Sequence, residues 1–287
     1  MNLIEMVKAA GVVGAGGAGF PTHVKLNTNV EYFIVNAAEC EPLIETDKYL
    51  CRTFADRIIR TIPQIAEAIG ASKKVIALKG AYEKEIAALK VAIREQNSDV
   101  EIFELGYFYP AGDEQTLIQQ VTGRCVPERG LPSDVGCVVD NVGTVLNIAD
   151  ALEGKAVTEK YLSLVGEVEH PIQLRVPIGT PVLECVKAAH PTVSDFALIM
   201  GGPMMGKQLT EQAAMEQAVV TKTTGNILVL PKDHYLFRKA SLPMETVRKQ
   251  TKSACLQCKM CTELCPRYLI GHQIHPNLMM RGLWLEP

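Results

Sequence analysis

Strands and helices alternate along the first half of the sequence, and this order restricts the fold more than any other feature. Short apolar runs typical of buried strands occupy residues 30–36, 73–80 and 100–106. Segments with apolar residues at helical spacing occupy 47–70, 83–96 and 113–123. Because parallel strands need a crossover helix between them, the alternation predicts an α/β domain with a parallel sheet. A loop, a short strand and a helix over 127–154 complete this domain, which we expect to span residues 1–156.

The sequence pattern changes after residue 156. Short β-like pieces with one helical segment, 181–189, predict a small β-rich module over 157–215 that is compatible with a β-grasp arrangement. We expect a strand and a polar linker over 216–250. Residues 251–287 contain a dense cysteine run and form the last predicted segment.

Composition excludes two classes of function. The net charge is −3, with 29 basic and 32 acidic residues, whereas nucleic-acid binding usually needs a basic face. No apolar stretch reaches the ~18 residues of a membrane span. The N-terminal "MNLIEMVKAAG" has charges inside its apolar run, which favours a short amphipathic helix over a signal peptide. We therefore expect a cytoplasmic protein with no transmembrane segment.

The run "CLQCKMCTELCP" has the spacing C-x2-C-x2-C-x3-C-P. This is the ligand spacing of bacterial ferredoxin-type [4Fe–4S] clusters, and it predicts metal ligation by Cys255, Cys258, Cys261 and Cys265. A zinc site, which usually has two separated C-x2-C pairs, and inert cysteines are the alternatives. In two-cluster proteins the fourth cysteine ligates the other cluster, so Cys265 closes a single cluster or belongs to a second one. The other five cysteines are expected in the core, with Cys40 in an acidic loop as the exception to watch.

The segment "GVVGAGGAGFPTHVK" contains G-x-G-x-x-G, the spelling of a dinucleotide-binding loop. Such a loop follows a strand, opens a helix and has an acidic residue roughly 20 positions later. Glu39 satisfies the distance, but the preceding segment is helical and Pro21 opposes a long helix after the loop. A non-Rossmann cradle, in which backbone N–H groups approach a flavin or a phosphate, is the favoured interpretation. A Rossmann loop and a tight turn without a ligand remain alternatives.

Several blocks resemble one protein family over essentially the whole chain. "GAGGAGFPTHVK" followed by "VNAAECEP" is similar to the flavin-binding segments of the FMN subunit of respiratory complex I and of the Rnf complex C subunit. "YPAGDEQTLI", "VTGRCVPERGLPSDVG" and "NVGTVLNI" resemble further blocks in the same order. "GGPMMG" resembles the end of the soluble-ligand-binding β-grasp (SLBB) module. "CPRYLIGHQIHPNLMMR" looks most like the cobalamin reductases of propanediol-utilisation microcompartments.

The resemblance implies a Rossmann-like parallel-sheet FMN domain of the complex I flavin-subunit type, an SLBB β-grasp module and a ferredoxin-like iron–sulfur segment. It implies that NADH donates a hydride to FMN and that the electrons pass singly to a [4Fe–4S] cluster and on to cobalamin. An Rnf-type C subunit is the alternative oxidoreductase. A non-catalytic scaffold that binds a ligand or a shell protein is the alternative from another class.

The resemblance also assigns residue roles. Close backbone contact with FMN is implied for Gly14, Gly16, Gly17 and Gly19. Phe20 would lie beside the nicotinamide pocket, and Lys25 would supply a cation to the flavin or its phosphate. Asn36 would bond the isoalloxazine edge, and Glu39 and Glu41 would face the incoming nucleotide. The phosphate side would be held by Asn141 and Thr144. From the residues alone, Lys25 also fits a solvated surface lysine and Asn36 a strand-end turn.

Partners and location follow from the resemblance alone. They are NADH, cobalamin or a cobalamin-dependent enzyme system, and a microcompartment shell protein or a cobalamin adenosyltransferase. The implied place is inside or at the shell of a bacterial microcompartment. Family members continue into a second C-x2-C-x2-C-x3-C-P run that is missing here, so the resemblance implies a C-terminally truncated chain.

Overall fold

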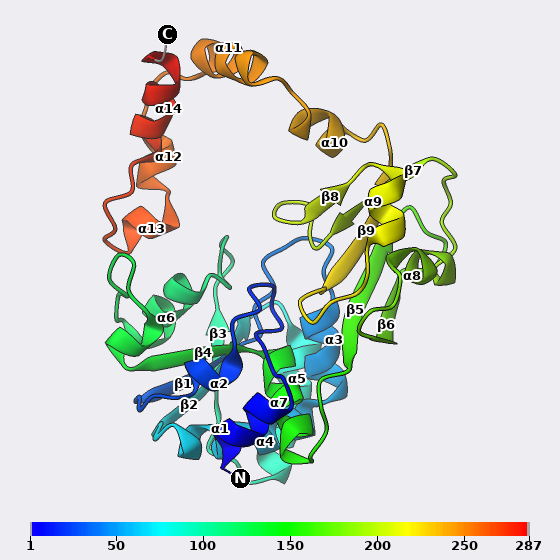
Figure 1. The fold of residues 1–287 in the computed structure, drawn as a ribbon. Coiled ribbons are helices and arrows are strands. Elements are labelled where there is room, and N and C mark those ends of the chain that lie inside the picture. Colours follow the sequence, from blue (N-terminus) through cyan, green and yellow to red (C-terminus); the bar gives the residue numbers. More distant parts are fainter. Residues whose placement is uncertain (1, 286–287) are drawn as a thin grey trace.

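A four-stranded parallel sheet forms the centre of the first domain in the computed structural model, which describes residues 2–285 (Figure 1). Its strands are β1 (Tyr32–Asn36), β2 (Lys73–Lys79), β3 (Glu101–Leu105) and β4 (Cys137–Asn141). They are ordered β3-β2-β1-β4, and every neighbouring pair is parallel. The parallel α/β fold predicted from the alternation of strands and helices is confirmed.

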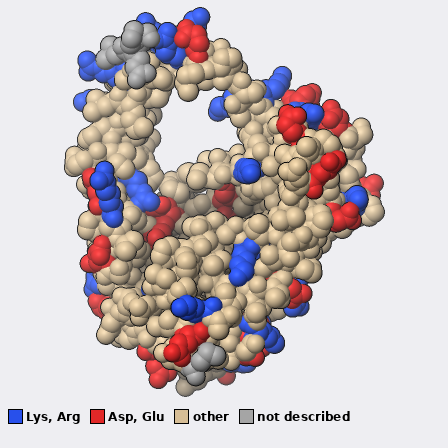
Figure 2. All heavy atoms as spheres, in the orientation of Figure 1, with Lys and Arg blue, Asp and Glu red and all other residues tan. Residues whose placement is uncertain are grey.

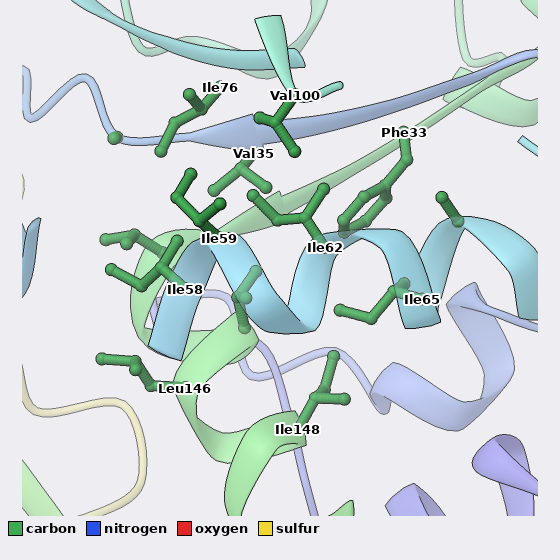
Figure 3. Packing of buried hydrophobic residues seen from close by; sticks show 14 of the residues in the cluster. Phe33, Val35, Ile58, Ile59, Ile62, Ile65, Ile76, Val100, Leu146 and Ile148 are labelled. Atoms are coloured by element: carbon green, nitrogen blue, oxygen red, sulfur yellow. The ribbon is translucent and has the colours of Figure 1, made fainter. Parts of the chain in front are cut away.

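Helices cover this sheet and bury its core. They are α3 (Thr46–Thr53), α4 (Ala55–Ala68), α5 (Glu83–Glu95), α6 (Glu114–Thr122) and α7 (Val142–Leu152), with a 3₁₀ turn at Pro132–Val135. Ile58, Ile59, Ile62 and Ile65 of α4 are fully buried among residues of β1, β2 and α7 (Figure 3). Each such side chain contributes about 1.5–3 kcal/mol by leaving water. This packing makes the sheet a rigid base for the loops at its edge.

The single helix expected over 47–70 is wrong: the structure divides it into α3 and α4 at Phe54. Phe54 has φ −123° and ψ 26°, outside the helical region. Its ring packs against Tyr49 at 6.4 Å and against Tyr161 of the second module at 5.5 Å. Helical periodicity continues through residue 54, so the break follows from tertiary contact rather than from local sequence.

The glycine loop lies between two helices, α1 (Leu3–Ala9) and the short α2 (Thr22–Lys25). An isolated antiparallel bridge between Val13 and Pro21 closes its base. Because no strand precedes the loop and no long helix follows it within the described residues, the Rossmann alternative does not hold.

A mixed five-stranded sheet forms the second module. Its strands are β5 (Glu159–Gly166), β6 (Ile172–Pro177), β7 (Phe196–Met200), β8 (Lys207–Leu209) and β9 (Asn226–Pro231). The order is β6-β5-β9-β7-β8, and β9 runs parallel to β5 in the centre. With α8 (Val182–Ala188) and α9 (Gln212–Gln217) packed on one face, this is a β-grasp arrangement. The sheet thus takes in residues 226–231, which we assigned to the strand-and-linker segment, and it carries one helix more than expected.

The remaining chain returns to the first domain. The segment expected as a polar linker contains the helices α10 (Tyr235–Ala240) and α11 (Met244–Ala254), which lead to α12 (Met260–Glu263), α13 (Pro266–Leu269) and α14 (Pro276–Leu285). These elements arch away from the β-grasp module and come back beside α6, leaving an opening through the molecule (Figures 1 and 2). Over residues 2–285, none of the helices combines the length and apolarity needed to cross a bilayer.

Candidate functional site

A cavity of about 1470 Å³ lies between the parallel sheet and the β-grasp module. Its walls come from the glycine loop, from the segments after β1 and β4, from α3, and from two β-grasp loops at 200–207 and 221–225. β1 and β4 are adjacent and parallel, so their carboxyl ends open at the same edge. In open α/β sheets this edge is the usual place for ligands.

The structure brings about half of the predicted site residues to this cavity. Those that line it are Gly16, Gly17, Asn36, Glu39, Glu41 and Asn141. Those that do not line it are Gly14, Gly19, Phe20, Lys25 and Thr144. The two groups differ in what they contact.

Residues of the second group support the glycine loop on the side away from the cavity. The Gly14 N–H donates to the Phe20 carbonyl at 2.9 Å, which keeps the loop closed. Thr144 is fully buried, and its Oγ1 accepts from the Ala15 N–H at 2.9 Å. Phe20 itself is half exposed. These residues hold the loop tip at the cavity without facing the cavity themselves.

Lys25 is turned toward the protein rather than toward the cavity. Its Nζ donates to the Val139 carbonyl at 2.6 Å and to Glu114 at 3.2 Å, and it lies 3.7 Å from Asp140. Burial raises the pKa of Asp140 to about 6, and Lys25 opposes that rise. The structure therefore gives Lys25 an ion-pairing role within the first domain.

Close packing favours glycine at two positions of the cavity wall and enforces it at one of them, Gly112. A Cβ on Gly16 would come 3.3 Å from the Asn141 side chain. A Cβ on Gly112 would come 2.0 Å from the Ala38 carbonyl oxygen, a distance that no side chain tolerates. Gly112 is also held by Asn36, whose Nδ2 donates to its carbonyl at 2.9 Å. Backbone thus forms the wall where side chains would fill it.

Cys40 is part of this wall and also packs against the core behind it. Its Sγ accepts a hydrogen bond from the Gly112 N–H at 2.7 Å, and burial raises the pKa of the thiol. Of the other scattered cysteines, Cys51, Cys137 and Cys185 are buried as expected, whereas Cys125 is exposed.

Glu39 and Glu41 place two carboxyl groups in the cavity. Glu39 Oε1 accepts from the Glu41 N–H at 3.1 Å, and Glu41 Oε2 accepts from the Met204 N–H of the β-grasp module at 3.1 Å. The other Glu41 oxygen, Oε1, is buried and has no hydrogen-bond partner among the described residues. Burial, together with the nearby Asp47, raises the pKa of Glu39 to about 7. An uncommitted acceptor of this kind suits a ligand that carries hydroxyl or amide donors.

The charged cavity residues that sequence reasoning missed include Asp47 and Lys160. Asn141 Nδ2 donates to Asp47 Oδ2 at 2.6 Å, and Lys160 Nζ donates to the Ala15 carbonyl at 3.0 Å. Burial raises the pKa of Asp47 and lowers that of Lys160 to about 8. No local motif marks either residue: Asp47 reaches the site on α3 of the first domain, next to Asn141, and Lys160 reaches it from β5 of the β-grasp module.

The four cysteines of the C-terminal run are free thiols. Within residues 2–285 no three His, Cys, Asp or Glu side chains lie close enough together to hold a metal ion, so the structure does not gather these four. The backbone between them is sharply turned, since Gln257 and Lys259 both have positive φ, at 54° and 65°. Four soft sulfur donors on so short and turned a loop suit an iron–sulfur cluster.

The cysteine segment docks on the first domain beside the cavity. Arg267 Nη2 lies 2.7 Å from Asp113 Oδ1, and Nη1 of the same guanidinium bonds to Gln115. Asp113 lines the cavity and caps α6 through the Thr116 N–H. His272 is buried, with Nε2 at 2.9 Å from the Val126 carbonyl, and so packs the segment against the first domain. Cys265 thus lies two residues from a direct contact with the cavity wall.

A glycine-walled cavity at the carboxyl edge of a parallel sheet, next to a ferredoxin-type cysteine run, defines a class: proteins with a flavin domain and an iron–sulfur segment. Residues 7–150 match the family of the Nuo51 FMN-binding domain, and residues 254–286 match the 4Fe-4S dicluster domain. The chain belongs to the Nuo51 FMN-binding family.

Similar proteins extend beyond the length of this chain. Cobalamin reductase PduS of Citrobacter freundii is 46% identical over 281 residues, which cover 97% of this chain and 61% of that protein. The C subunit of the Na(+)-translocating ferredoxin:NAD(+) oxidoreductase complex of Acetobacterium woodii is 34% identical over 287 residues, covering 98% of this chain and 61% of that protein. The chain therefore spans 61% of the length of these two relatives.

The fold also occurs in a solved structure. A chain of an NAD+-reducing [NiFe]-hydrogenase in the H2-reduced state superposes with a TM-score of 0.72 at 22% identity, covering 96% of this chain and 55% of that one. At this identity the likeness concerns the fold alone. It agrees with the predicted arrangement of a flavin-subunit-type domain followed by further modules.

The cavity residues fit FMN by three observations. The wall is backbone at Gly16, Gly17 and Gly112, so a flat ring system can approach it closely. Glu41 Oε1 has no hydrogen-bond donor among the described residues, and a ribityl hydroxyl of FMN can supply one. The volume of about 1470 Å³ exceeds the range of about 300–1,000 Å³ usual for small-ligand pockets, which leaves room for a second ligand.

Proposed function

We propose that this chain is the flavin and iron–sulfur part of an oxidoreductase that carries electrons from NADH to cobalamin. The single observation that carries the proposal is the docking of the cysteine segment, through Arg267 and Asp113, on the wall of the glycine-lined cavity. Because Arg267 lies two residues after Cys265, a cluster held by these cysteines would lie near the proposed flavin site, as electron transfer between the two requires. The family matches to an FMN-binding domain and a 4Fe-4S dicluster domain support the proposed flavin site and the proposed cluster site.

Bound FMN accepts a hydride as an electron pair, and a [4Fe–4S] cluster takes electrons one at a time. The protein binds and orients the cofactors and excludes competing reactions. Gly16 and Gly17 would present backbone to the flavin, and Asn141 would flank them. Glu41 Oε1 would accept a hydrogen bond from a ribityl or ribose hydroxyl. Glu39, whose pKa is raised to about 7, can hold or release a proton near neutral pH beside the bound ligands.

Cysteine ligation is proposed on spacing and donor chemistry. Cys255, Cys258, Cys261 and Cys265 would hold the cluster by closing their turned loop around it. Arg267, two residues after Cys265, would keep that cluster beside the cavity.

Cobalamin as the acceptor is supported by similarity to a protein whose name is Cobalamin reductase PduS. The finer proposals rest on the sequence resemblance: an SLBB identity for the β-grasp module, contact with a microcompartment shell protein or a cobalamin adenosyltransferase, and a place inside or at the shell. Binding of cobalamin to the purified chain, monitored by the absorption spectrum of cobalamin, tests directly whether cobalamin is the acceptor.

The second candidate is an electron-transport protein, favoured by 34% identity to the C subunit of a ferredoxin:NAD(+) oxidoreductase complex. The two candidates differ in the acceptor. Reduction of cobalamin by the NADH-treated chain supports the first. Reduction of a ferredoxin, without reduction of cobalamin, supports the second.

The cofactor content of anaerobically purified protein tests whether the chain binds both FMN and an iron–sulfur cluster. We expect bound flavin that is released as FMN, together with iron and acid-labile sulfide. The variant Cys258→Ser should lose iron and sulfide but keep FMN, because the two sites have separate residues. A chain that binds only zinc, or that binds no flavin, contradicts the proposal.

A further inference from the structure

Two lysines of the β-grasp module hold the glycine loop of the first domain. Lys160, in β5, donates from Nζ to the Ala15 carbonyl at 3.0 Å. Lys222, in the loop before β9, donates from its ammonium group to the Gly11 carbonyl. The same loop brings Thr223 against Gly19, where an added Cβ would lie 3.0 Å from Thr223 Cγ2. The module therefore contacts the glycine loop at three places along its length.

Ala15 is held from both modules at once. Its N–H donates to Thr144 Oγ1 of α7 at 2.9 Å, while its carbonyl accepts from Lys160. Both partners are buried: Thr144 is fully enclosed and Lys160 is 8% exposed. Because Gly16 and Gly17 follow directly and line the cavity, the position of the loop tip depends on this peptide.

Burying the Lys160 ammonium is costly, and the structure compensates the cost locally. The Asp47 carboxylate opposes the lowering of the Lys160 pKa that burial causes. Asp47 also accepts from Asn141 Nδ2 at 2.6 Å, and Gly16 packs against the Asn141 side chain. Lys160, bonded to the Ala15 carbonyl, and Asn141, bonded to Asp47, thus flank the loop tip.

The match to the FMN-binding family ends at residue 150, before either lysine. We infer that the β-grasp module is a structural half of the flavin site, with Lys160 as the positioning residue that fixes the glycine loop and Lys222 as a second anchor. The inference rests on the proposed FMN site and extends it beyond the first domain. Its consequence is that FMN affinity depends on contacts that the first domain alone does not contain.

The test compares FMN affinity among variants of the full chain, measured by the quenching of flavin fluorescence. Lys160→Met keeps the aliphatic length and removes the charged donor, and we expect at least about tenfold weaker FMN binding. Lys222→Met should weaken it less, because that contact lies farther from the cavity-lining glycines. Lys187→Met is the matched control, since Lys187 is an exposed lysine of α8 in the same module. The FMN affinity of this control should stay within about twofold of wild type.

Two further measurements separate positioning from general destabilisation. Lys160→Arg restores a charged donor and should recover most of the affinity lost in Lys160→Met. Amide hydrogen exchange of residues 11–20 in the FMN-free chain should accelerate in Lys160→Met and stay unchanged in Lys187→Met. If Lys160→Met does not fold, Lys222→Met and Lys160→Arg carry the comparison.

The outcomes distinguish this inference from the proposed function. Wild-type protein that binds FMN, with Lys160→Met binding equally well and exchanging equally slowly at residues 11–20, overturns the inference alone. Wild-type protein that binds no FMN contradicts the proposed function. In that case, faster exchange in Lys160→Met still supports the loop anchor as such, and unchanged exchange overturns it.

Discussion

Glu39 lies in the cavity wall among other carboxyl groups, with Glu41 and Asp47 both close enough to affect its protonation. Burial is the main reason that its pKa rises to about 7 from an ordinary value of 4.5, and the Asp47 carboxylate adds to the rise. The backbone N–H of Glu41, which bonds to Glu39 Oε1, only partly offsets this effect. The charge of the Glu39 carboxyl therefore changes near neutral pH.

The raised pKa predicts a pH dependence of stability. Between about pH 4.5 and 7 the folded protein holds the Glu39 proton more tightly than the unfolded chain, so the free energy of unfolding falls as the pH rises through this window. Glu39→Gln keeps an oxygen for the Glu41 N–H and removes the charge. We expect the variant to gain on the order of 1–2 kcal/mol over wild type at pH 7.5 relative to pH 4.5, after allowance for solvent in the cavity.

Urea denaturation of the wild type and of Glu39→Gln at the two pH values measures this difference. Glu104→Gln, at an exposed carboxyl of β3, is the control, and its difference from wild type should not change with pH in this way. If the free energies of unfolding of wild type and Glu39→Gln changed equally with pH, Glu39 would not be buried as a neutral acid, and the prediction would be wrong.

At the residue scale, sequence reasoning found the positions that local motifs mark. Gly16, Gly17, Asn36, Glu39, Glu41 and Asn141 all line the cavity. The cation assigned to the flavin was Lys25, but Lys25 is committed to the Val139 carbonyl and Glu114. Among the described residues three lysines do line the cavity, Lys155, Lys160 and Lys207, and Lys160 is the buried one. In sequence Lys160 looks like any polar residue at a strand start. Only the approach of two modules buries it.

At the scale of elements, the sequence pattern of β9 predicts the strand itself but not the strands with which it pairs. Its apolar run predicts a strand, and the strand is present at Asn226–Pro231. Its neighbours are β5, which it meets in parallel, and β7, which it meets antiparallel. The β5 pairing joins segments about sixty residues apart, a contact that no local periodicity encodes. The break at Phe54 has the same origin, because Tyr161 of the second module packs against that ring.

The contact between α13 and α6 predicts a separable docking step. Arg267→Ala removes the bonds to Asp113 and Gln115 but leaves the four cysteines in place. We expect amide exchange in residues 266–273 to rise by about three- to tenfold, since a partly exposed ion pair in a small network contributes about 0.5–1.5 kcal/mol. Iron content should stay close to that of wild type.

Hydrogen exchange with mass spectrometry measures this opening peptide by peptide. Lys249→Ala is the control, because Lys249 is an exposed residue of α11 and pairs only with Glu245 of its own helix among the described residues. Equal exchange rates in Arg267→Ala and wild type would show that the segment is held by other contacts, such as His272 with the Val126 carbonyl.

At the scale of the whole molecule, three parts meet around one cavity wall. The first domain supplies the glycine loop, the β-grasp module closes the cavity, and the chain then arches back so that α13, just after the cysteine run, docks beside α6 (Figure 1). The sequence order of these parts was predictable from composition and spacing. Their meeting was not, because it depends on contacts such as Arg267 with Asp113 between residues far apart in the chain.

This arrangement leads to the central claim, that electrons entering at the cavity leave through the cysteine segment. The most direct test is the electron paramagnetic resonance spectrum of anaerobically reconstituted protein, with FMN and iron–sulfur content first verified, before and after NADH is added. We expect NADH to bleach the flavin absorbance and to produce a reduced [4Fe–4S] signal, which Cys258→Ser lacks. A fully loaded protein whose flavin does not bleach with NADH, or whose cluster stays silent while the flavin is reduced, would contradict the claim.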